Sequence, residues 1–156
     1  MRRAAALLLA LAIIAAAPAP VVKHATGTFE VQILPEAQAP APPEGVPTAR
    51  MALEKDFTGG LVGAATGTML SAGALAPGSA AYYVAIDQFR GKLDGRIGGL
   101  VLLHRGTMSK QGSVLSIDIA PDSGTGELKG ITGSLKIVIR GDKHFYDLAY
   151  SLPAKR

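Results

Sequence analysis

Short runs of alternating apolar and polar residues recur along the 156-residue chain, with turn signals between them and no long stretch of helical period. Such alternation is typical of β-strands that bury one face. Residues 100–103 are apolar on both faces, as in a strand that meets water on neither side. The pattern predicts an all-β sandwich or barrel. The predicted strands cover residues 25–34, 48–57, 61–72, 80–89, 100–103, 114–119, 134–140 and 145–152.

Glycines punctuate these runs. Gly59 and Gly60 predict a tight turn that joins two antiparallel strands. A helix over residues 61–76 is the competing interpretation, but each of its glycines would cost about 1 kcal/mol there. The glycines of residues 95–106 indicate bends or close backbone approaches, as barrel corners require.

Two details of register and length are also predicted. Met51 and Leu53 are expected on one face of their strand, and Phe57 is predicted to be out of register with them. Arg90 and Gly91 are expected to begin the connection that follows the strand of residues 80–89.

The segments between strands are predicted from proline and glycine. Residues 35–47 contain five prolines, which cannot lie inside a sheet, so we expect a solvent-exposed loop there. A single helical turn is expected over residues 126–130, within the loop that follows Pro121.

The first residues predict export. Arg2 and Arg3 precede an apolar run over residues 4–17, which fits a secretory signal peptide and is shorter than the ~20 residues of a spanning helix. An uncleaved membrane anchor is the alternative. We expect residues 1–17 to be removed and the mature protein to be periplasmic or extracellular, with no membrane span. Behind the signal, the sequence predicts a linker (18–24), one barrel domain (25–152) and a short tail (153–156).

Composition excludes several classes of protein. The chain has no cysteine, which rules out disulfides and lipid attachment at a lipobox cysteine. Its net charge of +4 falls to +2 when Arg2 and Arg3 leave with the signal. That balance is unlike the basic footprint of a nucleic-acid-binding protein.

Five motifs follow one another along the chain: ATGTFEV, AAYYVAID, GRIGGLVLLHRGTM, PDSGTGELKGITG and HFYDLAYSL. Together they resemble a bacterial family of uncharacterised proteins, domain-of-unknown-function family 3224. The resemblance covers residues 25–152 and implies a closed antiparallel barrel of eight strands, similar to allene oxide cyclase. The plant namesake of that fold binds a fatty-acid epoxide in its cavity, but the family itself implies no activity.

His104 is the first candidate for a functional side chain. Strand alternation places it on one face with Arg96, Leu100 and Leu102, which would line a ligand site if that face is inside the barrel. There, His104 would carry a proton or orient a ligand. The alternative, which we favour, is a structural histidine bonded to a neighbouring strand or loop.

Four acids lie at or beside strand ends, where a carboxylate in an apolar barrel would act as a general acid. No spacing pairs them, so we expect solvated surface acids, except that Glu127 is expected to cap backbone amides. Glu36 is a second catalytic candidate, and Tyr83 and Asp87 are candidates for ligand binding. The four acids are Glu36, Glu54, Asp87 and Glu127.

No metal or cofactor is expected. The three histidines lack ligand-pair spacing, and the glycines of residues 124–130 have no following lysine and serine as a phosphate-binding loop needs.

The sequence leaves three functions open. We favour non-catalytic binding of a small, largely apolar molecule inside the barrel. An isomerase or cyclase acting on an apolar substrate is the first alternative. The second is a structural or protein-interaction module, for instance a homodimer, if one apolar face of residues 100–103 lies outside the barrel.

Overall fold

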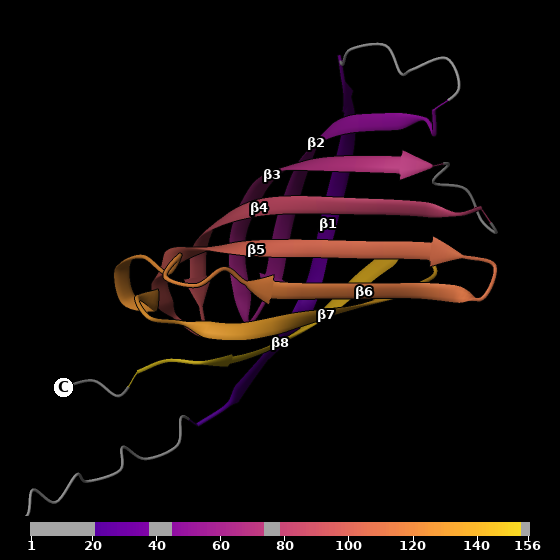
Figure 1. The fold of residues 1–156 in the computed structure, drawn as a ribbon. Helices are drawn as coiled ribbons and strands as arrows, with labels where there is room; N and C mark the ends of the chain where they lie inside the picture. The colour runs from indigo at the N-terminus through magenta and orange to yellow at the C-terminus, as the bar shows by residue number, and fades with distance from the viewer. Residues whose placement is uncertain (1–20, 38–44, 74–78, 154–156) are drawn as a thin grey trace, which may run out of the picture.

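Eight antiparallel strands form a closed barrel in a computed structural model that describes residues 21–37, 45–73 and 79–153 (Figure 1). Each strand pairs with its neighbours in the chain, and β8 pairs with β1. The predicted all-β, eight-stranded barrel is therefore confirmed. The strands are β1 (Lys23–Glu36), β2 (Thr48–Gly59), β3 (Leu61–Gly73), β4 (Ala81–Leu93), β5 (Arg96–Ser109), β6 (Gly112–Ile119), β7 (Thr132–Arg140) and β8 (Lys143–Ser151).

Several predicted connections fall where expected. Gly60 separates β2 from β3, and the expected helical turn is a 3-10 turn, η1 (Gly126–Leu128). The predicted signal peptide and residues 38–44 of the proline-rich loop lie outside the described residues.

The prediction that Arg90 and Gly91 begin a connection is wrong, because β4 continues to Leu93. Gly91 lies opposite Gly63 of β3 and Gly98 of β5, so three glycines form a row across adjacent strands. A Cβ atom on Gly91 would lie 2.2 Å from the carbonyl oxygen of Val62. The glycine therefore marks a close backbone approach within the strand and does not mark its end.

Phe57 is in register with Met51 and Leu53, contrary to prediction. All three side chains point into the barrel, and Lys55 occupies the inward position between Leu53 and Phe57. Because the inward position between Leu53 and Phe57 is a lysine, the alternation of apolar and polar residues is interrupted there, and Phe57 looks out of register in the sequence.

The half of the barrel beside Gly60 and η1, which we call the closed end, is filled by side chains. A single large cluster of buried residues includes Leu61, Leu93 and Leu128, which are fully buried. Above them lies a group of aromatic rings centred on Phe57, whose ring centroid is 5.2 to 5.7 Å from its neighbours in Phe29, Phe89 and Tyr146. This packed half supplies most of the hydrophobic stabilisation.

Tyr146 ties the aromatic cluster to the turn between β2 and β3. Its hydroxyl accepts a hydrogen bond from the Leu61 amide at 2.7 Å and donates one to the Thr58 carbonyl at 3.1 Å. Burial raises the pKa of this tyrosine, so the hydroxyl remains a donor at neutral pH.

Replacing Tyr146 by phenylalanine should lower the free energy of unfolding by about 1–3 kcal/mol, because the buried Leu61 amide and the Thr58 carbonyl lose a partner. Urea unfolding followed by circular dichroism measures the change. The matched control is Tyr82→Phe on the exposed outer face, which should stay within about 0.5 kcal/mol of the parent protein. Equal stability of the two variants would contradict this role of Tyr146.

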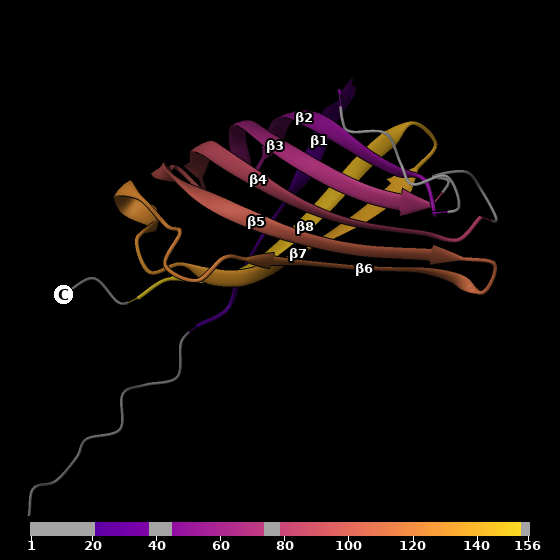
Figure 2. The ribbon, with the colours of Figure 1, turned by 45° about the horizontal axis from the view of Figure 1, so that its top comes forward.

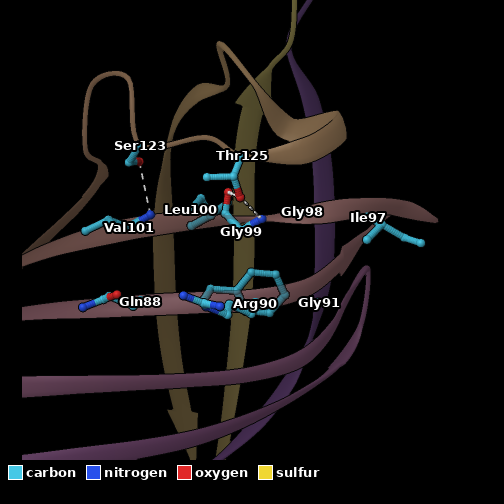
Figure 3. A pocket seen from close by; sticks show the side chains of 11 residues that line it. Gln88, Arg90, Gly91, Ile97, Gly98, Gly99, Leu100, Val101, Ser123 and Thr125 are labelled. Carbon is cyan, nitrogen blue, oxygen red and sulfur yellow. Dashed lines mark hydrogen bonds between the residues drawn. The ribbon is translucent and has the colours of Figure 1, made fainter.

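The loop after β6 takes the place of a strand beside β5. Gly99 N donates to Thr125 Oγ1 and Val101 N donates to Ser123 Oγ, at 2.9 and 3.1 Å (Figure 3). Glu127 accepts from the Ile97 amide at 2.9 Å, which confirms the predicted capping role. The loop thus satisfies the edge of β5 beyond the last residue that β6 reaches.

The junction between β6 and β7 is the loosest in the barrel. Among the described residues, these two strands pair with each other only at Asp118 and Ser134. Toward the end that carries the Gly141–Asp142 turn, which we call the open end, the hairpin of β7 and β8 diverges from β6 (Figure 2). No helix among the described residues is long and apolar enough to cross a membrane.

Candidate binding cavity

The barrel interior is hollow toward the open end. A cavity of about 480 Å³ lies above the packed core, within the usual size range of small-molecule sites. Its wall is mostly apolar and includes side chains from every strand. The lining residues are Phe29, Val31, Ile33, Leu53, Lys55, Met69, Tyr83, Ala85, His104, Met108, Leu115, Ile137, Ile139 and His144.

A buried polar cluster of Lys55, Asp87 and His104 lies at the floor of this cavity, where Lys55 and His104 line it and Asp87 lies behind them. Lys55 Nζ donates to Asp87 Oδ2 at 2.5 Å, and His104 Nε2 lies 2.9 Å from the same oxygen. The three residues expose 8%, 1% and 6% of their surfaces. The ammonium group of Lys55 and the carboxylate of Asp87 are too deeply buried for water to solvate their charges. Each charge is therefore stabilised by the other.

Small residues on β3 allow the cluster to form across an intervening strand. Lys55 is on β2 and Asp87 is on β4, while Ala65 and Gly67 of β3 lie opposite Lys55 and Asp87, respectively. A Cβ atom on Gly67 would lie 2.2 Å from Asp87 Oδ1. The absence of a side chain at Gly67 therefore leaves the space that the carboxylate occupies.

The surroundings of Asp87 keep its side chain ionised. Burial alone would raise the pKa of this carboxyl, but the contact with His104 and the charge of Lys55 outweigh burial, and the pKa is lowered. Burial, together with the charge of Asp87, raises the pKa of Tyr83, whose hydroxyl therefore stays protonated in the cavity.

The floor is incompletely satisfied. In the part of the chain that the structure describes, the buried side-chain atoms without a well-aligned hydrogen-bond partner are Asp87 Oδ1 and His104 Nε2. Buried polar atoms normally find partners, and exceptions in native proteins often have a functional reason. Within the same described residues, no group of three His, Cys, Asp or Glu side chains is arranged to hold a metal ion.

The structure brings three predicted site residues together, namely Tyr83, Asp87 and His104. The expectation that Asp87 is a solvated surface acid is wrong, because it is almost fully buried. His104 has a protein partner in Asp87, as the favoured structural role requires, but it also lines the cavity.

The other predicted site residues lie elsewhere. Leu100 and Leu102 share a face with His104, but both belong to the packed core below the floor. Arg96 is at the start of β5, near the closed end. Glu36 is exposed and accepts a hydrogen bond from Arg50 at 2.7 Å.

Lys55 is the functional candidate that the sequence analysis missed. Its position between Leu53 and Phe57, two inward-facing residues, was the available signal. A charged residue inside an otherwise apolar strand face is expensive to bury, which is itself an indication of a specific partner.

A second hollow of about 490 Å³ lies on the outer wall, between β4, β5 and the docked loop (Figure 3). Gln88, Arg90 and Ile97 border it, while Gly99 and Val101 at its centre already have loop partners. It is explained by the way the loop packs on β5. We therefore place the candidate site inside the barrel.

These features define a class: a small antiparallel β-barrel with one end packed and a polar-floored cavity at the other. The chain belongs to the family described as "Protein of unknown function (DUF3224)", whose family model matches residues 25–150. It is also similar to the crystal structure of a DUF3224 protein of unknown function from Shewanella oneidensis MR-1. The two chains share 41% sequence identity with a TM-score of 0.78, over 86% of this chain and 100% of the other. No curated protein matches the chain.

Proposed function

We propose that this protein is exported and binds a small, largely apolar molecule in the barrel cavity without transforming it. The observation that carries the proposal is the cavity of about 480 Å³, whose wall is apolar above a floor of few polar groups. Small-molecule sites commonly combine an apolar wall with a small number of placed polar groups. An eight-stranded barrel is also the size that holds one small ligand.

The rim of the cavity offers a direct test. Leu115 points into the cavity, whereas its neighbour Val114 points outward and is exposed. Leu115→Trp should weaken binding of N-phenyl-1-naphthylamine, a neutral fluorescent apolar probe, about tenfold, because the indole overfills the rim. Titration of probe fluorescence measures the affinity.

Val114→Trp is the matched control and should bind the probe like the parent protein. The chain has no tryptophan, so each variant also carries a single indole reporter. Emission from position 115 should respond to the probe and emission from position 114 should not. A parent protein that binds no probe, or equal loss in both variants, would refute the cavity as the binding site.

The contact between His104 and Asp87 favours an isomerase or cyclase as the second candidate. A histidine held by a carboxylate at a cavity floor is positioned for proton transfer to an apolar substrate. Chromatography coupled to mass spectrometry of the molecules that co-purify with the parent protein and with His104→Gln distinguishes the two functions. Different isomers in the two samples would support catalysis, whereas the same compound in both supports binding.

An apolar outer face supports the third candidate, an interaction module that forms a homodimer. Ile86 and Leu103 lie opposite each other on β4 and β5, and both side chains are on the outside, Leu103 with 39% of its surface exposed. Leu70 and Val84 form an equivalent exposed pair on β3 and β4. A concentration-dependent dimer in analytical ultracentrifugation, lost in Leu103→Asp, would support this function.

A further inference from the structure

We propose that the cavity selects an apolar molecule with one neutral carbonyl oxygen, as in a ketone or an ester, and that the Lys55 ammonium group binds this oxygen. The inference rests on the proposed function and adds the chemical class of the ligand. It derives from the number of donors and the balance of charge at the floor.

Lys55 has donors left over for a ligand. An ammonium group carries three N–H donors, and among the described residues it donates one hydrogen bond, to Asp87 Oδ2. On another side, Nζ lies 5.7 Å from the centroid of the Phe29 ring, which offers no lone pair. Lys55 also lines the cavity, and we infer that its remaining donors reach an acceptor there.

The charge balance favours a neutral acceptor. When the histidines are neutral, Lys55 and Asp87 carry the formal charges among the described residues of the floor and wall. The positive charge of Lys55 and the negative charge of Asp87 cancel. A ligand carboxylate would add a negative charge without compensation in an apolar cavity. A carbonyl oxygen accepts the same charge-assisted hydrogen bond and adds no net charge.

Asp87 cannot give way to a carboxylate ligand. Its Oδ2 accepts a hydrogen bond from Lys55 and lies 2.9 Å from His104 Nε2, and its second oxygen is packed against Gly67. The pairing of Lys55 with Asp87 therefore persists when a ligand enters. The floor acts as a neutral donor site and not as a cationic one.

Three naphthalenes of similar shape test this inference: 2-acetylnaphthalene (ketone), 2-isopropylnaphthalene (hydrocarbon) and 2-naphthoate (acid). Their affinities are measured at pH 8 by displacement of N-phenyl-1-naphthylamine from the parent protein and from Lys55→Met/Asp87→Asn. This double variant removes both charges and keeps the shapes of the side chains. Circular dichroism and the unfolding transition establish that the variant is folded.

The ratio of the ketone affinity to the hydrocarbon affinity should fall about tenfold in the double variant, because one charge-assisted hydrogen bond is lost. The ratio cancels the different solubilities of the two compounds in water. In the parent protein the acid should bind more weakly than the ketone. An unchanged ratio, or an acid that binds more tightly than the ketone, would overturn the inference while leaving apolar binding intact.

If the parent protein binds N-phenyl-1-naphthylamine but none of the three compounds, the inference fails and apolar binding stands. If it does not bind the probe either, the proposed function fails and the inference fails with it. If the double variant does not fold, a second measurement decides. The ¹³C resonance of a labelled carbonyl in bound 2-acetylnaphthalene should lie downfield of its position in hexane, as a hydrogen-bonded carbonyl requires. A resonance at the hexane position would overturn the inference.

Discussion

Replacing Lys55 by methionine should destabilise the barrel by about 3–5 kcal/mol, because the charge of Asp87 would remain buried without its cation. Asp87 exposes 1% of its surface, so water cannot replace the lost partner. Urea unfolding followed by circular dichroism measures the loss. Lys92→Met, on the exposed outside of β4, is the matched control and should change stability by less than about 0.5 kcal/mol.

The double variant Lys55→Met/Asp87→Asn should recover most of the stability that Lys55→Met loses. Replacing both members of a buried ion pair is often close to neutral, whereas removing one leaves an uncompensated charge. If the single and double variants unfold at the same urea concentration, the interaction between Lys55 and Asp87 is not the cause of the loss.

The ion pair also has a pH signature. The pKa of Asp87 is lowered in the folded state. Its contribution to stability is therefore complete above the unfolded-state pKa of about 3.9 and is lost as pH falls toward the lower folded-state pKa. The stability difference between the parent protein and the double variant should decrease on acidification through this range. A difference that is constant with pH would contradict the ionised, stabilising role of Asp87.

Replacing Gly67 by alanine should cost about 3 kcal/mol, because the added methyl group overpacks the site. Its Cβ atom would lie 2.2 Å from Asp87 Oδ1 and 2.6 Å from the Ile86 carbonyl oxygen, and the backbone oxygen cannot move freely. The carboxylate must move away, which disrupts its contacts with Lys55 and His104. The loss should be visible both in urea unfolding and as a weaker pH dependence of stability.

The control for this substitution is Thr66→Ala, the neighbouring position on the outside of β3. It introduces the same side chain into the same strand without entering the barrel. Similar stability for the two variants would show that the carboxylate does not depend on the space beside Gly67.

Alternation in the sequence predicted most of the strands, since their inward positions are mostly apolar. Residues 100–103 were predicted from apolarity on both faces, but they are part of the longer β5 (Arg96–Ser109), and Leu103 is exposed on the outside. Closure into a barrel did not follow from alternation, which is equally compatible with a sandwich, and was predicted from the resemblance. Strand ends were harder where glycine lies inside a strand. Gly91 looks like a turn residue, but its role is to let β3 and β4 approach closely.

The site was predicted only in part, because its members are separated in sequence and meet through strand register. His104 and Asp87 were identified as candidates, but no spacing links them to each other or to Lys55, which is 32 residues from Asp87. The contact depends on the small size of Ala65 and Gly67 on the strand between them. A sequence pattern does not show which side chain crosses a neighbouring strand.

Because β6 and β7 pair at one position, the closed barrel is held together least along the margin between these two strands. Along the rest of that margin, the described backbone amides of β6 that face β7 lack a strand partner. By contrast, β4 is paired with a strand on both sides along its length. We therefore expect amide hydrogens of β6 along this margin to exchange with solvent faster than those of β4. We also expect the joining of β6 to β7 to contribute less to the cooperativity of unfolding than the joining of β1 to β8, which pair over seven positions.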